Sequence, residues 1–218
     1  MKGKLIVLDG TDGSGKTTQT ELLVERLKKE RHSVEVISFP QYGDKCAGLV
    51  EDYLAGRFGT AKEVGPYRAA IFYAGDRYAA SSKIRKWLSE GKVVIANRYV
   101  FSSMGHQAGK ISDLSKRDGF LAWLKDLEYN IFGIPKEDLN ILLYVPFEIG
   151  MELAKKRAKG NKQDIHEVDV GHMKEASESY LYVAKKFKWP VIECAPSGSI
   201  LPKEEIAEMV WKKVKKAL

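Results

Sequence analysis

The chain is short of the features that mark secreted, membrane-spanning and metal-binding proteins. Its 218 residues include only two cysteines, Cys46 and Cys194, which lie far apart and match no metal-ligand spacing. This scarcity excludes a disulfide framework and favours a reducing compartment, so we expect a cytoplasmic protein. Apolar runs are short too. Residues 5–8 are too few for a signal-peptide core, and the longest later run, 141–146, is far short of a membrane span.

Internal repeats, low-complexity tracts and linkers are also missing, which predicts one domain over residues 1–218. With 44% hydrophobic and 30% charged residues, the composition is that of a globular chain. The net charge of +7 permits nucleic-acid binding, but the sequence has no helix-turn-helix, zinc pattern or basic stripe with interleaved aromatics. We therefore expect a small polyphosphate substrate, with neither nucleic acid nor a membrane as partner.

What the chain does have is a regular alternation of strand and helix patterns. Five short runs rich in Val, Ile and Leu are typical of strands buried on both faces: residues 4–9, 33–38, 92–97, 140–145 and 191–194. Seven helices are predicted: residues 17–29, 45–55, 66–90, 113–131, 147–159, 168–187 and 203–217. Such units predict an α/β fold of three layers, a five-stranded parallel sheet with helices on both faces. Ligands are expected outside the carboxyl ends of the strands.

A glycine-rich loop joins the first strand to the first helix. Residues 10–17 read GTDGSGKT and fit the phosphate-loop pattern GxxxxGK[ST] at every fixed position. Glycines let backbone N–H groups surround phosphate oxygens, Lys16 can reach the β- and γ-phosphates, and the Thr17 hydroxyl can ligate Mg²⁺. The positive end of the new helix also favours an anion. We expect a nucleoside triphosphate to contact Gly10, Thr11, Asp12, Gly13, Ser14, Gly15, Lys16, Thr17 and Thr18.

Phosphate loops serve motors, switches and kinases, so a second site must identify the substrate. Arg98 directly follows a central strand, where its guanidinium can hold a phosphate with two hydrogen bonds. The alternative is an arginine that only pairs with a nearby carboxylate. Tyr73 and Arg77 are four apart on one helix face and can stack on and hydrogen-bond a base, although such an aromatic also fits plain core. Residues 39–43, FPQYG, form a tight loop at the same sheet edge.

Together these segments resemble the thymidylate kinase family over essentially the whole chain. That family has an acidic-Gly pair before xDGxGKTT, FPxR after its second strand, a Phe, Ala and Arg motif in the next helix, and DRYxxSxxAYQ after its third strand. The corresponding segments here are DGTDGSGKTT, FPQY, FYAGDR and NRYVFSSMGHQ. The resemblance implies a P-loop NTPase fold, ATP and Mg²⁺ as cofactors, and conversion of dTMP to dTDP. It also implies a homodimer, with helices 45–55 and 66–90 as the interface.

The resemblance assigns roles residue by residue. Arg98 would hold the dTMP phosphate, and Arg77 would hydrogen-bond the thymine ring. Asp12 would accept the deoxyribose 3′-hydroxyl, and Lys16 would act on the donor phosphates, so Asp12, Lys16 and Arg98 are expected to be catalytic. The rest of the acceptor pocket would be formed by Phe39, Pro40, Tyr42, Phe72 or Tyr73, Ser102, Ser103 and Gln107.

Several positions depart from the family pattern. Asn97 replaces the Asp of DRY, and we hypothesise that Asp9 supplies the missing charge near Mg²⁺, beside the Thr17 ligand. Tyr42 replaces the Arg of FPxR, for which Lys45 is a candidate substitute. His106 stands at a position that is often aromatic in the family. These changes fit a divergent subgroup or an altered choice of monophosphate.

The phosphate loop contains no arginine, so the resemblance moves the expected catalytic cation to a mobile lid at about residues 155–167. Arg157 is our candidate, with Lys159 and Lys162 as alternates. A solvated basic helix end is the alternative interpretation. Within the lid, Ile165 stands in place of a family arginine.

The sequence is compatible with three functions. The first is a dTMP kinase, with a kinase for dUMP or for several monophosphates close behind it. The second is a phosphate-loop regulator that binds nucleic acid, which the basic charge permits. The third is a domain with a vestigial nucleotide site, suggested by Asn97 and Tyr42.

Overall fold

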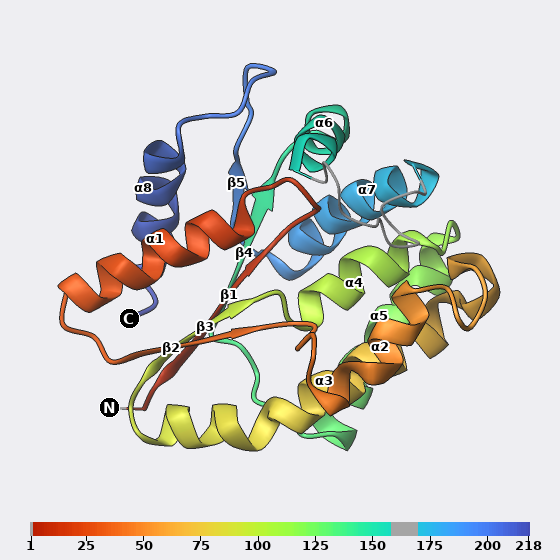
Figure 1. Ribbon diagram of the computed structural model, residues 1–218, viewed down its shortest axis with the longest axis horizontal. Coiled ribbons are helices and arrows are strands. Elements are labelled where there is room, and N and C mark those ends of the chain that lie inside the picture. Colours follow the sequence, from red (N-terminus) through yellow and green to blue (C-terminus); the bar gives the residue numbers. More distant parts are fainter. Residues whose placement is uncertain (1, 158–169) are drawn as a thin grey trace.

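A five-stranded parallel sheet forms the centre of the computed structural model, which describes residues 2–157 and 170–218 (Figure 1). The strand order is β2-β3-β1-β4-β5. The strands are β1 (Lys4–Asp9), β2 (Val34–Ser38), β3 (Val93–Asn97), β4 (Leu139–Tyr144) and β5 (Val191–Glu193). All five predicted strands are confirmed, with ends that differ by no more than one residue.

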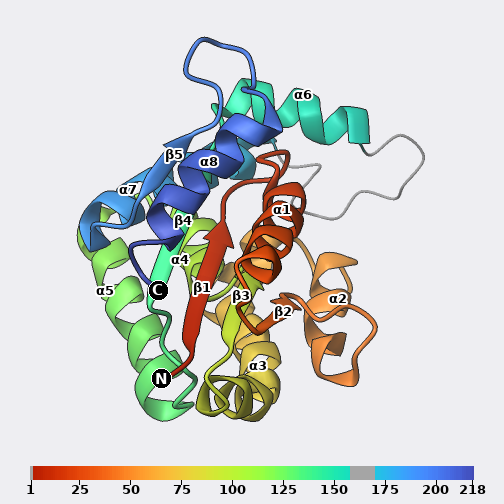
Figure 2. The same cartoon turned by 90° about the vertical axis from the view of Figure 1, so that its left-hand side faces the viewer.

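Helices cover both faces of the sheet (Figures 1 and 2). One face carries α1 (Lys16–Lys29) and α8 (Lys203–Val214), and the other carries α3 (Ala61–Ser89), α4 (Val100–Gly109), α5 (Leu114–Lys125) and α7 (Val170–Phe187). Because neighbouring side chains of a strand point to opposite faces, Leu5 and Val7 of β1 enter one core and Ile6 and Leu8 the other. The predicted three-layer α/β fold is therefore confirmed.

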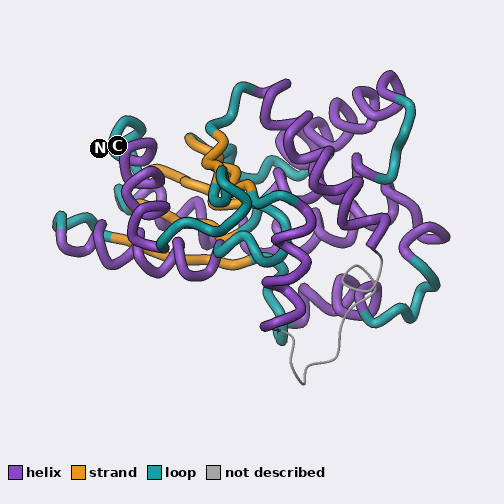
Figure 3. Tube along the Cα trace, turned by 90° about the horizontal axis from the view of Figure 1, so that it is seen from above, coloured by secondary structure: helices purple, strands orange, loops and turns teal. Residues whose placement is uncertain are grey.

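The remaining elements connect or continue the strands and helices named above. A 3₁₀ turn, η1 (Lys45–Ala47), and α2 (Gly48–Leu54) connect β2 to α3, and α6 (Phe147–Arg157) follows β4. A π-helical stretch, η2 (Asp126–Ile131), continues α5. Both chain ends lie on one side of the molecule, the side from which β1 starts (Figure 3). None of the helices in the described part is long and apolar enough to cross a membrane.

Helix α4 is the clearest error of the sequence prediction, which treated residues 100–109 as ligand-facing chain and not as a helix. The segment has poor local helix propensity, since it contains two glycines and a β-branched residue. Tertiary packing decides its structure. A Cβ on Gly105 would lie 2.6 Å from the Tyr180 ring, and one on Gly109 would lie 2.9 Å from the Glu175 carbonyl oxygen. The glycines therefore let α7 approach α4 closely.

Helix α3 also begins earlier than predicted, at Ala61 instead of Pro66. Thr60 and Glu63 form a capping box in which each side chain bonds the other's backbone N–H. Gly65, with φ 74°, then interrupts the helix just before Pro66, so the predicted start coincides with this kink. The T-x-x-E pattern is the sequence signal for the extra turn.

Candidate active site

A cavity of about 370 Å³ opens at the carboxyl edge of the sheet. It lies between the phosphate loop, the segment after β2, helix α3 and the segment after β3. The predicted site residues that line it are Asp12, Gly13, Gly15, Lys16, Thr17, Phe39, Pro40, Tyr42, Tyr73, Arg77, Arg98, Ser102, Ser103 and Gln107. The structure thus brings the proposed triphosphate and acceptor residues into one cavity. Its other lining residues are Ser38, Leu54, Asn97 and His106.

The phosphate loop wraps around the amino end of α1. Gly10 has φ 151°, and a Cβ there would lie 2.4 Å from the Leu143 carbonyl oxygen, so only glycine fits beside β4. Lys16 starts α1, and its ammonium donates to the carbonyl oxygens of Gly10 at 3.0 Å and Thr11 at 2.8 Å. The loop therefore presents a buried cation together with the positive end of a helix, which is an anion-binding arrangement.

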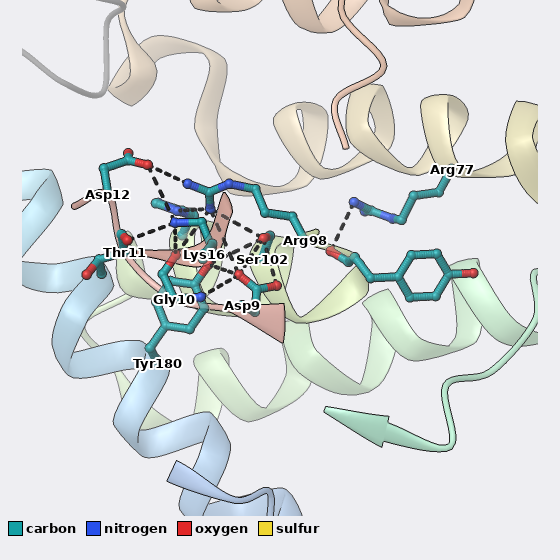
Figure 4. Close-up of polar contacts among 11 residues, drawn as sticks. Asp9, Gly10, Thr11, Asp12, Lys16, Arg77, Arg98, Ser102 and Tyr180 are labelled. Atoms are coloured by element: carbon teal, nitrogen blue, oxygen red, sulfur yellow. Dashed lines mark hydrogen bonds and ion pairs between the residues drawn. The ribbon is translucent and has the colours of Figure 1, made fainter. Parts of the chain in front are cut away.

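The Asp12 carboxylate, which lines the cavity, contacts two cations (Figure 4). Its Oδ1 accepts a hydrogen bond from Arg98 Nη2 at 2.5 Å and lies 3.8 Å from Lys16 Nζ. One carboxylate oxygen therefore marks a point that the guanidinium and the ammonium both reach. A phosphoryl oxygen at that point would meet the same two positive groups.

Arg98 is held in an unusual backbone conformation, with φ 66°. For a residue with a side chain this region costs about 1 kcal/mol, and such strain concentrates at functional sites. Nη1 contacts the Gly10 carbonyl oxygen and Ser102 Oγ at 3.4 Å each, and His106 Nε2 at 3.3 Å. Since a guanidinium can only donate, His106 Nε2 acts as the acceptor. Burial opposes the charged form, but the negative charge of Asp12 leads several contributions that outweigh burial and raise the pKa of Arg98.

The Asp9 carboxylate lies beneath Arg98 and is completely buried. Its Oδ1 accepts from the Gly10 backbone N–H and from Tyr180 at 2.8 and 2.9 Å, and Ser102 Oγ lies 2.8 Å from both carboxylate oxygens. Arg98 Nη1 is 3.9 Å away. Asp9 therefore joins β1, α4 and α7 below the phosphate site.

Arg77 lies at the other end of the cavity from the phosphate loop and is also buried (Figure 4). Its guanidinium forms a bidentate ion pair with the buried Glu128 and donates to Ser103 Oγ at 2.8 Å and to the Tyr99 carbonyl oxygen at 3.3 Å. Burial disfavours its charge, but Glu128 more than offsets this effect, so the pKa of Arg77 is raised. A fixed donor group therefore forms part of the cavity wall.

Some predicted residues lie elsewhere. Phe72 packs on Tyr53 and Phe58 and does not line the cavity, whereas Tyr73 does, so the structure favours Tyr73 of the two aromatic candidates. Thr18 is exposed, and Ser14 is buried within the loop. Lys45 is exposed at the start of η1 and does not line the cavity. The lid candidates, the side chain of Arg157 and residues 158–167, lie outside the described residues.

Two residues that the sequence did not single out complete the site. Glu128 pairs with Arg77 from a position 51 residues away, and Tyr180 reaches Asp9 from a position 171 residues away. Neither belongs to a local motif. The only available signal for Glu128 was the general need of a buried arginine for a carboxylate.

Comparisons with known proteins identify the family of this chain. A family model described as thymidylate kinase matches residues 8–201. The thymidylate kinase of Mycobacterium tuberculosis (strain H37Rv) is 31% identical over 169 residues, which cover 76% of this chain and 78% of that protein. The probable thymidylate kinase 1 of Saccharolobus solfataricus is 26% identical over 218 residues, covering 99% and 98%.

Solved structures share the architecture. The thymidylate kinase of Candida albicans matches 99% of this chain and 92% of its own, with 20% identity and a TM-score of 0.77, which shows a common fold. The family model covers most of this chain, and the mycobacterial relative exceeds 30% identity over three quarters of it. The chain belongs to the thymidylate kinase family.

Proposed function

We propose that this chain transfers the γ-phosphate of ATP to dTMP and releases ADP and dTDP. The observation that carries the proposal is the position of Lys16 and Arg98, which meet at Asp12 from the donor and the acceptor side of one cavity. A phosphate oxygen of dTMP attacks the γ-phosphorus while the bond to the ADP oxygen breaks. The reaction needs alignment and charge compensation more than covalent help from the protein.

Each residue then has a defined task. Lys16 stabilises charge on the β- and γ-phosphates, and Arg98 holds the dTMP phosphate in line with them. When substrates bind, the phosphates replace Asp12 as the partners of Lys16 and Arg98. The Asp12 carboxylate then becomes available as an acceptor for the deoxyribose 3′-hydroxyl. Arg77 donates to a base carbonyl, with Tyr73 beside the ring. A lid cation, for which Arg157 remains our candidate, completes charge compensation on the transferred group.

The residues present fit Mg²⁺. Among the described residues, no group of three or more His, Cys, Asp and Glu could hold a metal on its own. Magnesium does not need one, because it commonly binds substrate phosphates and water with one or two protein oxygens. Thr17 lines the cavity beside Lys16, and Asn97 Oδ1 is buried at the cavity without a hydrogen-bond partner in the described part of the chain. We propose Thr17 as the ligand and Asn97 as a contact to its water.

Asp9 fits a different role from the metal contact suggested by the sequence. Its carboxylate oxygens already accept from Gly10, Ser102 and Tyr180 and are buried. A metal ion would have to displace these donors. We propose that Asp9 instead fixes the loop and Arg98, and that Mg²⁺ supplies charge neutralisation to the phosphates when bound.

Turnover with a panel of monophosphates tests the substrate. With ATP and Mg²⁺ we expect the highest kcat/KM on dTMP, followed by dUMP, since Arg77 can serve a carbonyl oxygen that thymine and uracil share. The Candida albicans structure is described as revealing the origin of broad substrate specificity, so comparable turnover on several monophosphates is the nearest alternative. Turnover on dCMP or dGMP with none on dTMP would refute the proposal. Salt-dependent DNA binding without kinase activity would favour a regulator.

We also propose a homodimer formed through the outer face of α3. Ile71 and Tyr78 on this face are 44% and 53% exposed, and Gly75 lies between them at helical spacing. Gly75 is exposed, and a Cβ there would meet no atom within 4 Å. A glycine in an open helix interior costs about 1 kcal/mol relative to alanine. Close approach of a second α3 would account for it.

Cys46 and Cys194 are both free, which fits a reducing cytoplasm.

A further inference from the structure

Asp76 is a buried carboxylate that the proposed chemistry does not use. It precedes Arg77 on α3 and is 1% exposed. Whereas Arg77 and Tyr73 of the same helix line the cavity, Asp76 is not among the lining residues. A buried carboxylate is costly unless its oxygens are paired, so its partners indicate what it holds in place.

Those partners all come from one loop, residues 41–46, which follows β2. The Gln41 backbone N–H donates to Asp76 Oδ2 at 3.1 Å. The Gln41 side-chain amide donates to Oδ1 at 2.9 Å and to the Asp76 carbonyl oxygen at 3.1 Å. The Cys46 thiol lies 3.3 Å from Oδ1. One residue of α3 therefore ties down both ends of the loop.

The thiol acts here as a hydrogen-bond donor. Burial, followed by the hydrogen bond and the negative charge of Asp76, raises the pKa of Cys46 to about 12. The thiol therefore keeps its proton near neutral pH, which it needs in order to donate to the carboxylate.

Tyr42 of this loop and Pro40, directly before the loop, form part of one wall of the cavity. Pro40 and Tyr42 flank Gln41 and both line the cavity, as do Gly13 and Gly15 of the phosphate loop. Tyr42 is 63% exposed, so its own burial contributes little to holding the wall. The anchor at Gln41 helps to hold this wall, with an additional bond from the Gly43 N–H to Glu51 at 2.6 Å.

We propose that Asp76 is a positioning residue for acceptor binding: it fixes the loop 41–46 so that Pro40 and Tyr42 form a preorganised wall for the monophosphate. This inference rests on the proposed monophosphate kinase function. It differs from the direct contacts assigned above, because Asp76 acts only through Gln41 and Cys46.

The inference can be tested by exchanging the amide and the carboxylate between positions 41 and 76. Gln41→Glu places a second carboxylate against Asp76 and should release the loop by repulsion. Because the wall contacts the acceptor in both ground and transition states, we expect the KM for dTMP to rise at least ~10-fold, with kcat and the KM for ATP within ~3-fold. In Gln41→Glu/Asp76→Asn, the new amide can donate to the new carboxylate while its oxygen accepts from the backbone N–H of position 41. The KM for dTMP should return to within ~3-fold of wild type.

Hydrogen exchange separates this role from general destabilisation. Backbone amides of residues 41–46 should exchange at least ~10-fold faster in Gln41→Glu and recover in the double variant, with the phosphate loop unchanged. Gln41→Met, which removes the amide bonds without adding charge, serves if Gln41→Glu does not fold. Asp52→Asn, which breaks the surface pair with Arg57, is the matched control and should behave as wild type.

Two outcomes would overturn the inference: an unchanged KM for dTMP with unchanged exchange in Gln41→Glu or Gln41→Met, or a double variant no better than the single ones. A wild-type protein inactive on every monophosphate would instead refute the proposed function, and the exchange measurement would still decide whether Asp76 anchors the loop.

Discussion

Arg98 is the residue on which the proposed acceptor site depends most directly. Its strained backbone, at φ 66°, turns the side chain toward Asp12, and its Nη1 lies 3.9 Å from the buried Asp9. Arg98→Ala should therefore raise the KM for dTMP by about 10²-fold or more, because charge-assisted bonds to the phosphate disappear. The KM for ATP should change far less. Steady-state kinetics with each substrate varied in turn provide the measurement.

The control for this variant is Arg57→Ala, which removes an arginine of the same charge whose surface pair with Asp52 is largely exposed. It should leave both KM values unchanged. If Arg98→Ala kept wild-type affinity for dTMP, Arg98 would be a structural partner of Asp12 and not a substrate ligand.

Substitution of Arg157 tests whether the lid supplies the positive charge that an arginine in the phosphate loop would otherwise provide. The variable loop positions are Thr11, Asp12, Gly13 and Ser14, so the loop itself offers no guanidinium to the transferred phosphoryl group. Arg157→Ala should lower kcat by at least ~10²-fold and barely change the KM for dTMP, since its charge acts mainly in the transition state. Lys212→Ala, an exposed basic change on α8, should have no effect. Near-wild-type turnover would remove Arg157 from the catalytic set and leave Lys159 and Lys162 as the candidates.

Some residues of the site could be predicted from the sequence and others could not. Lys16, Arg98 and Arg77 could be placed in one crevice from sequence, because each lies in a motif tied to the end of a strand or to a helix face. Glu128 and Tyr180 could not, since their contacts depend on how α5, η2 and α7 pack. Long-range partners of buried charges are fixed by tertiary structure, and no local pattern encodes them.

Most strands and helices could also be predicted from the sequence, but two elements could not. The strands followed from apolar runs, and most helices from their periodicity. Helix α4 did not, because its glycines serve the contact with α7 and hide the helical signal. The π-helical η2 was predicted as ordinary helix, within residues 113–131. Its wider turns have no recognisable sequence signature, yet they carry Glu128.

Helix ends offer a prediction that concerns stability alone. Helices α3 and α7 end in the same motif. After α3, the Lys92 and Gly91 N–H groups bond the Trp87 and Leu88 carbonyls. After α7, the Trp189 N–H donates to the Ala184 carbonyl oxygen, and the Lys188 N–H donates to the Lys185 carbonyl oxygen. The turn residue has φ 77° at Gly91 but φ 56° at Lys188, where a side chain is unfavourable.

Lys188→Gly should therefore increase the free energy of unfolding by about 1 kcal/mol, because it relieves the left-handed strain at an exposed position. Gly91→Lys should decrease it by a similar amount. Urea denaturation followed by circular dichroism measures both changes. Equal stabilities of wild type and Lys188→Gly would show that the strain is offset by the greater entropy of glycine in the unfolded chain.

At the scale of the whole molecule, the outer face of α3 predicts the oligomeric state. Gly75→Arg would insert a long charged side chain between Ile71 and Tyr78, at the centre of the proposed interface. The dimer dissociation constant should rise by about 10²-fold or more. Within a monomer the same change should not destabilise, since arginine favours an exposed helix more than glycine does.

Gly119→Arg is the matched control for this experiment. Gly119 lies in α5, is exposed, and has no atom within 4 Å of an added Cβ, so the chemical change and the local environment are the same as at Gly75. Sedimentation velocity should show a dimer for wild type and Gly119→Arg and a monomer for Gly75→Arg, with similar melting temperatures. A dimer that survives Gly75→Arg would place the interface on another face, and a wild-type monomer would leave the exposed glycine of α3 without a structural reason.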